Sequence, residues 1–490
     1  MSFSFSTLLV GMGLTLVQFL AAVPWLLVAV GRGKMIDESF DKFAKKLGPP
    51  YVQWALLPGF AVAVAAVRAG WNLYRLWDSG EARSSVLGYG ALSGAALGLL
   101  LYFGVLIVGG FVYVTLALVS SRKDRQALLY AVAGGLVASA VIPAVFFVLT
   151  RDAEVVQNWG HVYAAVLQLQ LTVDFFVLFF PVLLPLWPKG GAVAQAAFRE
   201  GVRQPMFWLL LALAALVLVI GAFWPYFTFG EDYTMLKEIG LDVVMLTAVI
   251  FGVLAATMLV SEEIEGRTAV TLMSKPVSRR QFLLGKFAGI LLVCLLMFGL
   301  LGEYFESTLK LHRYIWRLDP LPAPGWVASL TTNNGLPTDA NDFVRGAALW
   351  TSLSVDTLPG LVLSFCHVMV LVCIAITLAT RLPMVLNLVM VISVFFLSHL
   401  TPTLVGKARR LQDLNPGSVV AQMLSFVSQV FDTLLPGLDF FRIDQVLVTD
   451  APPEPGPYAL YVLSVLFYAL LYTVIVMLFG LVLFEDRDLA

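Results

Sequence analysis

Long apolar blocks return throughout this chain, and each is about 20 residues long, the length of an α-helix that crosses a bilayer. Because 59% of the residues are hydrophobic and only 13% are charged, polar residues are too few to cover a soluble fold of this length. The expected fold class is therefore all-α, a polytopic transmembrane helical bundle of about 11 spans. The candidate spans are 8–30, 54–77, 89–119, 127–149, 161–187, 206–225, 240–260, 284–303, 359–379, 384–405 and 458–483.

Three of these blocks carry particular expectations. Block 54–77 contains Arg68 and Arg75, so it either crosses the bilayer or lies at the interface with snorkelling arginines, which would leave 10 spans. Block 89–119 exceeds a straight crossing, so it must tilt, break at Gly109-Gly110 or extend beyond the lipid. Block 8–30 follows no basic segment and ends without a small-residue cleavage site, so we expect a membrane span and not a removed signal peptide.

The distribution of Lys and Arg predicts the topology. If the C-terminus is cytoplasmic, the short inside segments hold more than half of the 31 basic residues, although the outside segments are about twice as long. With eleven crossings the N-terminus is then external. The expected location is the cytoplasmic membrane, with a bacterial inner membrane as the expected setting.

Two expected external loops are long. Residues 304–358 contain Pro320, Pro322 and Pro324 together with Trp316, Trp326 and Trp350, which favours a small cap resting on the bilayer or a packing element. Residues 406–457 contain apolar side chains at helical spacing from Val419 to Leu435. That pattern predicts an amphipathic helix, either in the outer interface or packed against the bundle.

The most distinctive stretch is the expected cytoplasmic loop 261–283. Three carboxylates end one span, and Gly266 can supply the left-handed residue that stops its helix. Residues 268–274 can form a short helix closed by Lys275-Pro276, and Ser278 with Gln281 forms a capping box that starts the next span. The pattern indicates a rigid charged knob at the membrane surface. An ordinary basic loop with incidental capping is the alternative.

This stretch closely resembles the first intracellular loop of type-2 ABC export permeases, whose pattern is E-E-x-E-x-G-T, a short apolar helix, S-K-P-V-S-R and then G-K. The matching residues are Glu262, Glu263, Glu265, Gly266, Thr268, Ser274 to Arg279, Gly285 and Lys286. Arg267 departs from the pattern as an insertion. The resemblance implies a coupling helix docked into an ATPase subunit, and it implies coupling roles for Glu262, Glu263, Glu265, Gly266, Arg267, Thr268, Lys275, Pro276, Arg279 and Arg280.

The resemblance extends over about residues 190–490, which hold six spans. Residues 198–208 resemble the family's amphipathic elbow helix, expected over 192–205, with Gln204 at its end and Pro205 in the first turn of the next helix. Residues 434–441 and 484–489 resemble its external segment before the last span and its charged cytoplasmic end. The proposed five-helix bundle of residues 1–189 matches no motif. The expected elbow residues are Phe198, Arg199, Arg203 and Pro205.

The sequence contains no phosphate-binding loop, since Gly285-Lys286 is followed by Phe287 and opens an apolar span. The resemblance therefore implies that this chain is a transporter subunit and no enzyme, with ATP and Mg bound by a separate cytoplasmic ATP-binding cassette subunit and no cofactor bound here. A second permease copy is also implied; symmetry favours a homodimer, with a heterodimer as the alternative. No metal-ligand spacing occurs, the three cysteines lie in apolar blocks, and a net charge of −1 argues against nucleic-acid binding.

Polar side chains inside the expected spans are the remaining functional candidates, namely Arg68, Asp174 and His367. Asp174 could pair with Arg68 or belong to a proton or ion path. His367 and His399 have no clustered partners in the sequence, so they are interpreted as bundle residues. Three functions follow: a permease subunit exporting an unidentified substrate, a membrane scaffold or assembly factor driven by a partner ATPase, or an ion-coupled secondary transporter that uses Asp174.

Overall fold

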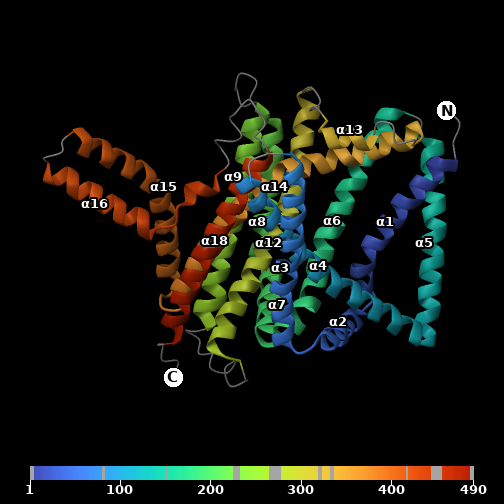
Figure 1. The fold of residues 1–490 in the computed structure, drawn as a ribbon, viewed down its shortest axis with the longest axis horizontal. Helices are drawn as coiled ribbons and strands as arrows, with labels where there is room; N and C mark the ends of the chain where they lie inside the picture. The colour runs from blue at the N-terminus through green and yellow to red at the C-terminus, as the bar shows by residue number, and fades with distance from the viewer. Residues whose placement is uncertain are drawn as a thin grey trace. The chain divides into compact units, whose positions relative to one another are not determined.

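The computed structural model describes residues 5–79, 83–150, 152–224, 232–263, 277–317, 323–331, 336–414, 418–442 and 455–485. These residues form helices joined by short connections, and no strand occurs among them (Figure 1). Eleven helices are long and apolar enough to cross a membrane, and one of them covers Pro50–Asn72, within the block that could have been interfacial. The prediction of an all-α polytopic helical bundle is confirmed.

The chain divides into two compact units. Unit 1 comprises Met1–Gly191 and Pro322–Ser352, and unit 2 comprises Ala192–Leu321 and Leu353–Ala490. The division passes through two helices, α7 (Pro188–Arg203) and α14 (Thr338–Ala379). A segment of the expected external loop 304–358 therefore belongs with the N-terminal helices and not with the spans that flank it.

Unit 1 contains six helices before α7. Most of them contact α4 or α6, and a small core forms around Phe40, Tyr102 and Leu106. The helices are α1 (Phe5–Ala29), α2 (Gly33–Leu47), α3 (Pro50–Ser79), α4 (Arg83–Ser120), α5 (Arg122–Leu149) and α6 (Ala153–Leu186).

Helix α4 runs through Gly109-Gly110 without a break, so that alternative for the long third block was wrong. The two glycines serve packing instead. The ring of Phe43 covers Gly109 and that of Phe40 covers Gly110, at distances where an added Cβ would overlap the ring. The amphipathic helix α2 thereby lies flush against α4, and Ile36, Phe40 and Ala44 are buried between them.

Unit 1 also includes Pro322–Ser352, which contains α13 (Gly325–Thr331) and the start of α14. Phe343 on α14 packs edge-on against Phe146 and Phe147 of α5, and Trp350 Nε1 donates a hydrogen bond to Gln168 Oε1 at 2.8 Å. This segment is therefore a packed part of unit 1, which favours the expected packing element over a cap resting on lipid.

Unit 2 holds the larger core, in which α9, α12 and the second part of α14 are the most enclosed helices. Phe282, Met297, Phe305, Val370 and Ile376 are fully buried there. Its elements are α8 (Pro205–Phe223), α9 (Asp232–Ala256), the π-helix η1 (Thr257–Glu262), α12 (Arg279–Ile315), α15 (Met384–Leu414), α16 (Val419–Leu434), the 3-10 turn η2 (Leu438–Phe441) and α18 (Pro455–Glu485).

The amphipathic helix predicted in the second long loop is present as α16. It begins at the N-cap Ser418, whose side chain accepts a hydrogen bond from Ala421 N at 3.4 Å. Helix α16 packs beside α15, so it contacts the bundle through the end of that helix.

Candidate functional site

The structure describes the two ends of the loop 261–283, residues 261–263 and 277–283. Helix α9 passes into the π-helix η1, which ends at Glu262, and α12 begins at Arg279. A π-helical segment within a long helix commonly marks a functional site. The predicted stop at Gly266 and the predicted short helix over 268–274 lie outside the described residues, as do Glu265, Arg267, Thr268, Lys275 and Pro276. Only the backbone of Glu262 is described.

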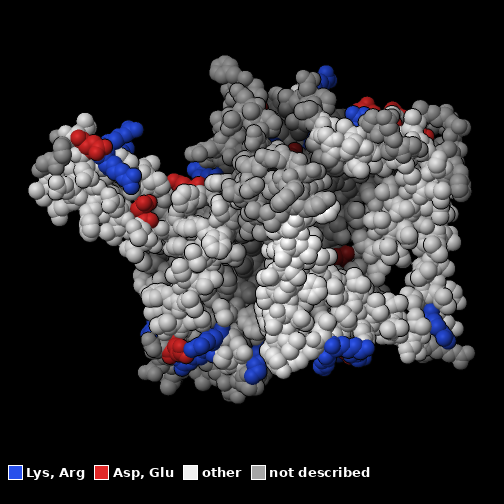
Figure 2. All heavy atoms as spheres, in the orientation of Figure 1, with Lys and Arg blue, Asp and Glu red and all other residues white. Residues whose placement is uncertain are grey.

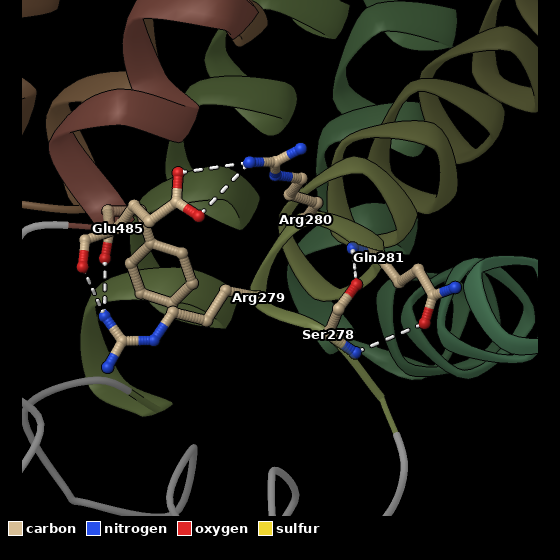
Figure 3. Close-up of polar contacts among 6 residues, drawn as sticks. Ser278, Arg279, Arg280, Gln281 and Glu485 are labelled. Carbon is tan, nitrogen blue, oxygen red and sulfur yellow. Dashed lines mark hydrogen bonds and ion pairs between the residues drawn. The ribbon is translucent and has the colours of Figure 1, made fainter.

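The start of α12 is fixed by the predicted capping box, which is confirmed. The Ser278 hydroxyl accepts a hydrogen bond from Gln281 N, and the Gln281 side chain accepts one from Ser278 N, both at 3.2 Å (Figure 3). Two of the unpaired N–H groups at the helix start are thereby satisfied. The capping box consequently fixes the residue at which the loop ends and α12 begins.

Lys286, two turns into α12, joins the first end of the loop to two other elements. Its ammonium donates a hydrogen bond to Glu263 Oε1 at 2.6 Å and lies 3.6 Å from Glu200 Oε2 on α7. The lysine side chain is only 5% exposed, whereas those of Glu263 and Glu200 are 25% and 52% exposed. A buried cation requires such partners, so the lysine ties the loop's first end to α12 and α7.

Arg279 and Arg280 bind the end of the last helix, α18. Arg279 Nη1 donates hydrogen bonds to the carbonyl oxygens of Phe484 at 3.0 Å and Glu485 at 2.8 Å (Figure 3). Arg280 Nη2 lies 3.2 Å from Glu485 Oε1. A cation at the C-terminal end of a helix is favoured because the last carbonyl groups there lack partners within the helix. The second end of the loop is thus bound to the C-terminal end of the chain's last span.

The ring of Phe484 completes this contact. It is fully buried and stacks on Phe282 with the ring planes 28° apart and the centroids 6.0 Å apart. The Arg279 guanidinium lies over the same ring, 5.9 Å from its centroid. The predicted charged end of the chain therefore contacts the loop's second end, which the sequence did not indicate.

A helix, α7, covers most of the segment expected to form the elbow, and it starts earlier than that segment, at Pro188. Gln204 follows the last residue of α7 and is the N-cap residue of α8 without a side-chain capping bond, and Pro205 occupies the first turn of α8, as predicted. Trp208 Nε1 donates a hydrogen bond back to the Val202 carbonyl at 3.0 Å, which fixes the bend between the helices. Phe198 packs against the core of unit 2, whereas Arg199 and Arg203 are exposed.

The site therefore contains functional candidates beyond those singled out from the sequence. Lys286 had a detectable signal, because a lysine within an apolar span needs a partner. Glu200, Phe484 and Glu485 had none, because their role depends on helices that are distant in sequence meeting at one end of unit 2. The structure brings Glu263, Arg279 and Arg280 to this end but joins them through different partners.

The polar candidates within the spans are arranged differently from the expectation. Asp174 is buried in unit 1, where its Oδ1 has no hydrogen-bond partner among the described residues, whereas Arg68 is exposed. No ion pair joins these two residues, both of which are described, so the predicted pairing was wrong. In unit 2, His367 is buried and stacks on His399 with ring centroids 5.6 Å apart, so the two histidines do cluster.

One buried carboxylate was not singled out from the sequence. Glu306 on α12 is buried in unit 2, where its two carboxylate oxygens accept hydrogen bonds from Ser354 at 2.8 Å and Thr357 at 3.0 Å on α14. These bonds replace the water that a buried carboxylate loses. Across the described ranges, no three His, Cys, Asp or Glu side chains are grouped as a metal site would require.

Comparison with known proteins gives one match. A family model described as ABC-2 family transporter protein matches residues 192–489, which is more than half of the chain. The matched region begins in α7 and includes every element of unit 2 described above. No curated protein and no solved structure matches the chain.

Proposed function

Because the chain belongs to the ABC-2 transporter family, it is the membrane-spanning permease subunit of an ATP-binding cassette transporter, and we propose that residues 261–283 couple it to a separate ATPase subunit during export. The permease is an integral membrane protein and no enzyme. In this proposal the partner binds ATP and Mg, and its closure on ATP moves the loop and the helices attached to it.

The observation that carries the proposal is that both ends of the loop are held to the membrane helices. Lys286 ties Glu263 to α12 and α7, and Arg279 and Arg280 tie the start of α12 to the end of α18. When both ends of a loop are bound to membrane helices, a displacement of the loop by a docked subunit also moves those helices. A loop without such contacts would move without displacing them. The loop is therefore suited to receive a docked subunit.

The push would reach the far side of unit 2 through α12. This helix has 37 residues, so it is about 55 Å long at about 1.5 Å per residue. It is buried along most of its length, and Gly289 lets the α7 backbone approach so closely that an added Cβ would lie 2.5 Å from the Ala194 carbonyl oxygen. Motion at Arg279 would consequently move α7 and the outer end of α12 together.

A complete transporter of this design needs two permease halves, and we propose that the second is another copy of this chain. The roles proposed for Glu262, Glu265, Gly266, Arg267, Thr268, Lys275 and Pro276 are docking and coupling, with Phe198, Arg199, Arg203 and Pro205 positioning the elbow. The substrate moves outward between the two halves. In the proposed orientation the end of unit 2 that carries the loop is cytoplasmic.

Co-purification from native membranes tests the proposal. Wild-type protein should retain an ATP-binding subunit, and the double variant Arg279→Ala/Arg280→Ala should lose most of it while still inserting into the membrane. Arg381→Ala is the matched control, because Arg381 is an exposed basic residue in the turn between α14 and α15. Undiminished co-purification and export with the double variant would contradict the proposal.

A further inference from the structure

The outer part of α15 and the whole of α16 form an arm of two helices. We define the arm as 401–414 together with Val419–Leu434. Figure 1 shows α15 bending away from the other helices of unit 2 and α16 returning beside it. Pro402 lies at the base of the arm, where proline removes a helix hydrogen bond and allows such a bend.

The helices of the arm meet through small side chains. The buried residues are Thr401, Val405 and Ala408 on α15 and Ala421, Ser425 and Ser428 on α16. Every other side chain of α16 is exposed, including Val420 at 76%, Phe426 at 68% and Leu434 at 69%. Helices in lipid typically contact one another through small residues and expose large apolar side chains. Burying apolar side chains there yields no hydrophobic stabilisation, because lipid tails are as apolar as the side chains.

Helix α16 has three distinct faces. At about 100° per residue, its large apolar side chains occupy an arc of about 160°. The small residues that contact α15 lie opposite this arc, and Gln422, Gln429 and Thr433 form a polar strip between them and one edge of the arc. An amphipathic helix of this kind lies along a bilayer surface, with its apolar face among acyl chains.

The length of α16 excludes a full crossing. Its 16 residues span about 24 Å, less than the hydrocarbon core of about 30 Å.

The start of α15 lies near the loop 261–283, so the arm at the other end of this helix lies at the end of unit 2 away from that loop. Asn387 near the start of α15 donates a hydrogen bond to Thr257 of η1 at 3.1 Å, and the helix then runs toward the opposite end.

Charged residues of the arm are concentrated on the distal part of α15. Lys407, Arg409 and Arg410 are exposed there within four positions, beside Asp413, whereas the apolar face of α16 carries no charge. In Figure 2 the charged atoms of the arm form a band across it, and most of its remaining described surface in that view is uncharged. The long basic side chains can reach phosphate groups from this position.

We propose that the arm is an interfacial anchor in the membrane leaflet opposite to the loop 261–283, with the α16 apolar face in the acyl chains and Lys407, Arg409 and Arg410 bound to the phosphate groups of anionic lipids. A second copy of the chain is the competing occupant. Lipid fits better because the apolar face of α16 has no charged or polar side chain that could fix the position of a second protein chain on it. In addition, α16 contacts α15 through small residues, which is the packing typical of helices in lipid. The anchor goes beyond the proposed coupling and does not depend on it.

Site-directed fluorescence on the full chain in liposomes tests where the arm lies. Cys294, Cys366 and Cys373 are fully buried, so a bimane label attaches selectively at Val427→Cys on the apolar face or Gln429→Cys on the polar face. Brominated acyl chains should quench the label at residue 427 strongly and iodide in water only weakly, with the reverse order at residue 429. Quenching at residue 427 by iodide alone would place the arm in water and overturn the proposal. Quenching by neither, with cross-linking of two copies through Val427→Cys, would show a protein interface and overturn it too.

The lipid selectivity is tested in the same liposomes. Bromine carried on phosphatidylglycerol should quench residue 427 more than bromine carried on phosphatidylcholine at equal total composition. The preference should fall by about fivefold or more in Lys407→Gln/Arg409→Gln/Arg410→Gln, since each basic group near an anionic surface contributes about fivefold in affinity. Arg381→Gln is the control and should keep the preference. Equal quenching by both lipids in the wild type would overturn the phosphate contact.

Discussion

Lys286 Nζ lies 2.6 Å from Glu263 Oε1, and this contact joins the first described end of the loop 261–283 to the helix that follows the loop. The lysine is nearly inaccessible to water, whereas the glutamate is a quarter exposed. The same ammonium lies within salt-bridge distance of Glu200. One buried cation therefore positions the first end of the loop 261–283 relative to both α7 and α12.

Removing the carboxylate of this pair should destabilise unit 2. Glu263→Ala removes the closest carboxylate of Lys286 and leaves the longer contact to Glu200, so we expect a loss of about 2 kcal/mol, the range of a hydrogen bond to a charged group. The measurement is the free energy of unfolding of the purified protein in detergent. Lys286→Met/Glu263→Met should be closer to wild type, because removing both partners leaves no unpaired buried charge. A double variant less stable than Glu263→Ala would contradict this account of the pair.

The Arg279 contact predicts that the last helix is protected at its end. Arg279→Lys cannot reproduce two guanidinium hydrogen bonds to adjacent carbonyl groups, and we expect a loss of about 1–1.5 kcal/mol, most of it local to the end of α18. Hydrogen exchange of the amides near Phe484 should become faster, with little change in α8. Arg280→Lys is the matched control, since its partner is an exposed side chain and the pair contributes little. Equal protection in both variants would show that Arg279 does not hold the helix end.

The close packing of α2 on α4 predicts opposite effects for two glycines of the same helix. A methyl group at Gly110 overlaps the ring of Phe40, whereas one at Gly104 meets nothing within 4 Å. Gly110→Ala should lower the free energy of unfolding of unit 1 by about 1–3 kcal/mol through overpacking. Gly104→Ala should raise it by up to about 1 kcal/mol, because alanine favours the helix. Similar thermal stability of the two variants would contradict the observed packing.

These contacts show which features a sequence can predict. The Ser278–Gln281 capping box, the Gln204-Pro205 junction and the apolar spans were predicted because each depends on residues within a turn or on a continuous apolar block. The Arg279–Glu485 contact joins residues 206 positions apart, and no local pattern indicates it. The same reason explains why Gly109-Gly110 suggested a break in α4: only the tertiary structure supplies the rings of Phe43 and Phe40 that fill the space.

The environment of Asp174 separates the permease from an ion-coupled transporter. Its carboxylate is buried and forms no ion pair with Arg68, so no such pair requires its negative charge, and an amide of nearly the same size can take its place. Asp174→Asn should therefore keep both membrane insertion and ATP-driven export. Export is measured in vesicles with and without an ion gradient. Loss of export in this variant, together with dependence on the gradient, would favour the secondary transporter instead.

Site-specific photo-crosslinking from the coupling loop tests the central claim most directly. A photoreactive amino acid replaces Leu272 in the full-length protein, and a control variant carries it in place of Arg381. After illumination of native membranes, the partner captured through residue 272 is identified by mass spectrometry. We predict an ATP-binding cassette subunit whose capture changes in yield on addition of ATP, with no such product from residue 381. Efficient capture of lipid or of other proteins, without an ATP-binding subunit, would contradict the coupling role.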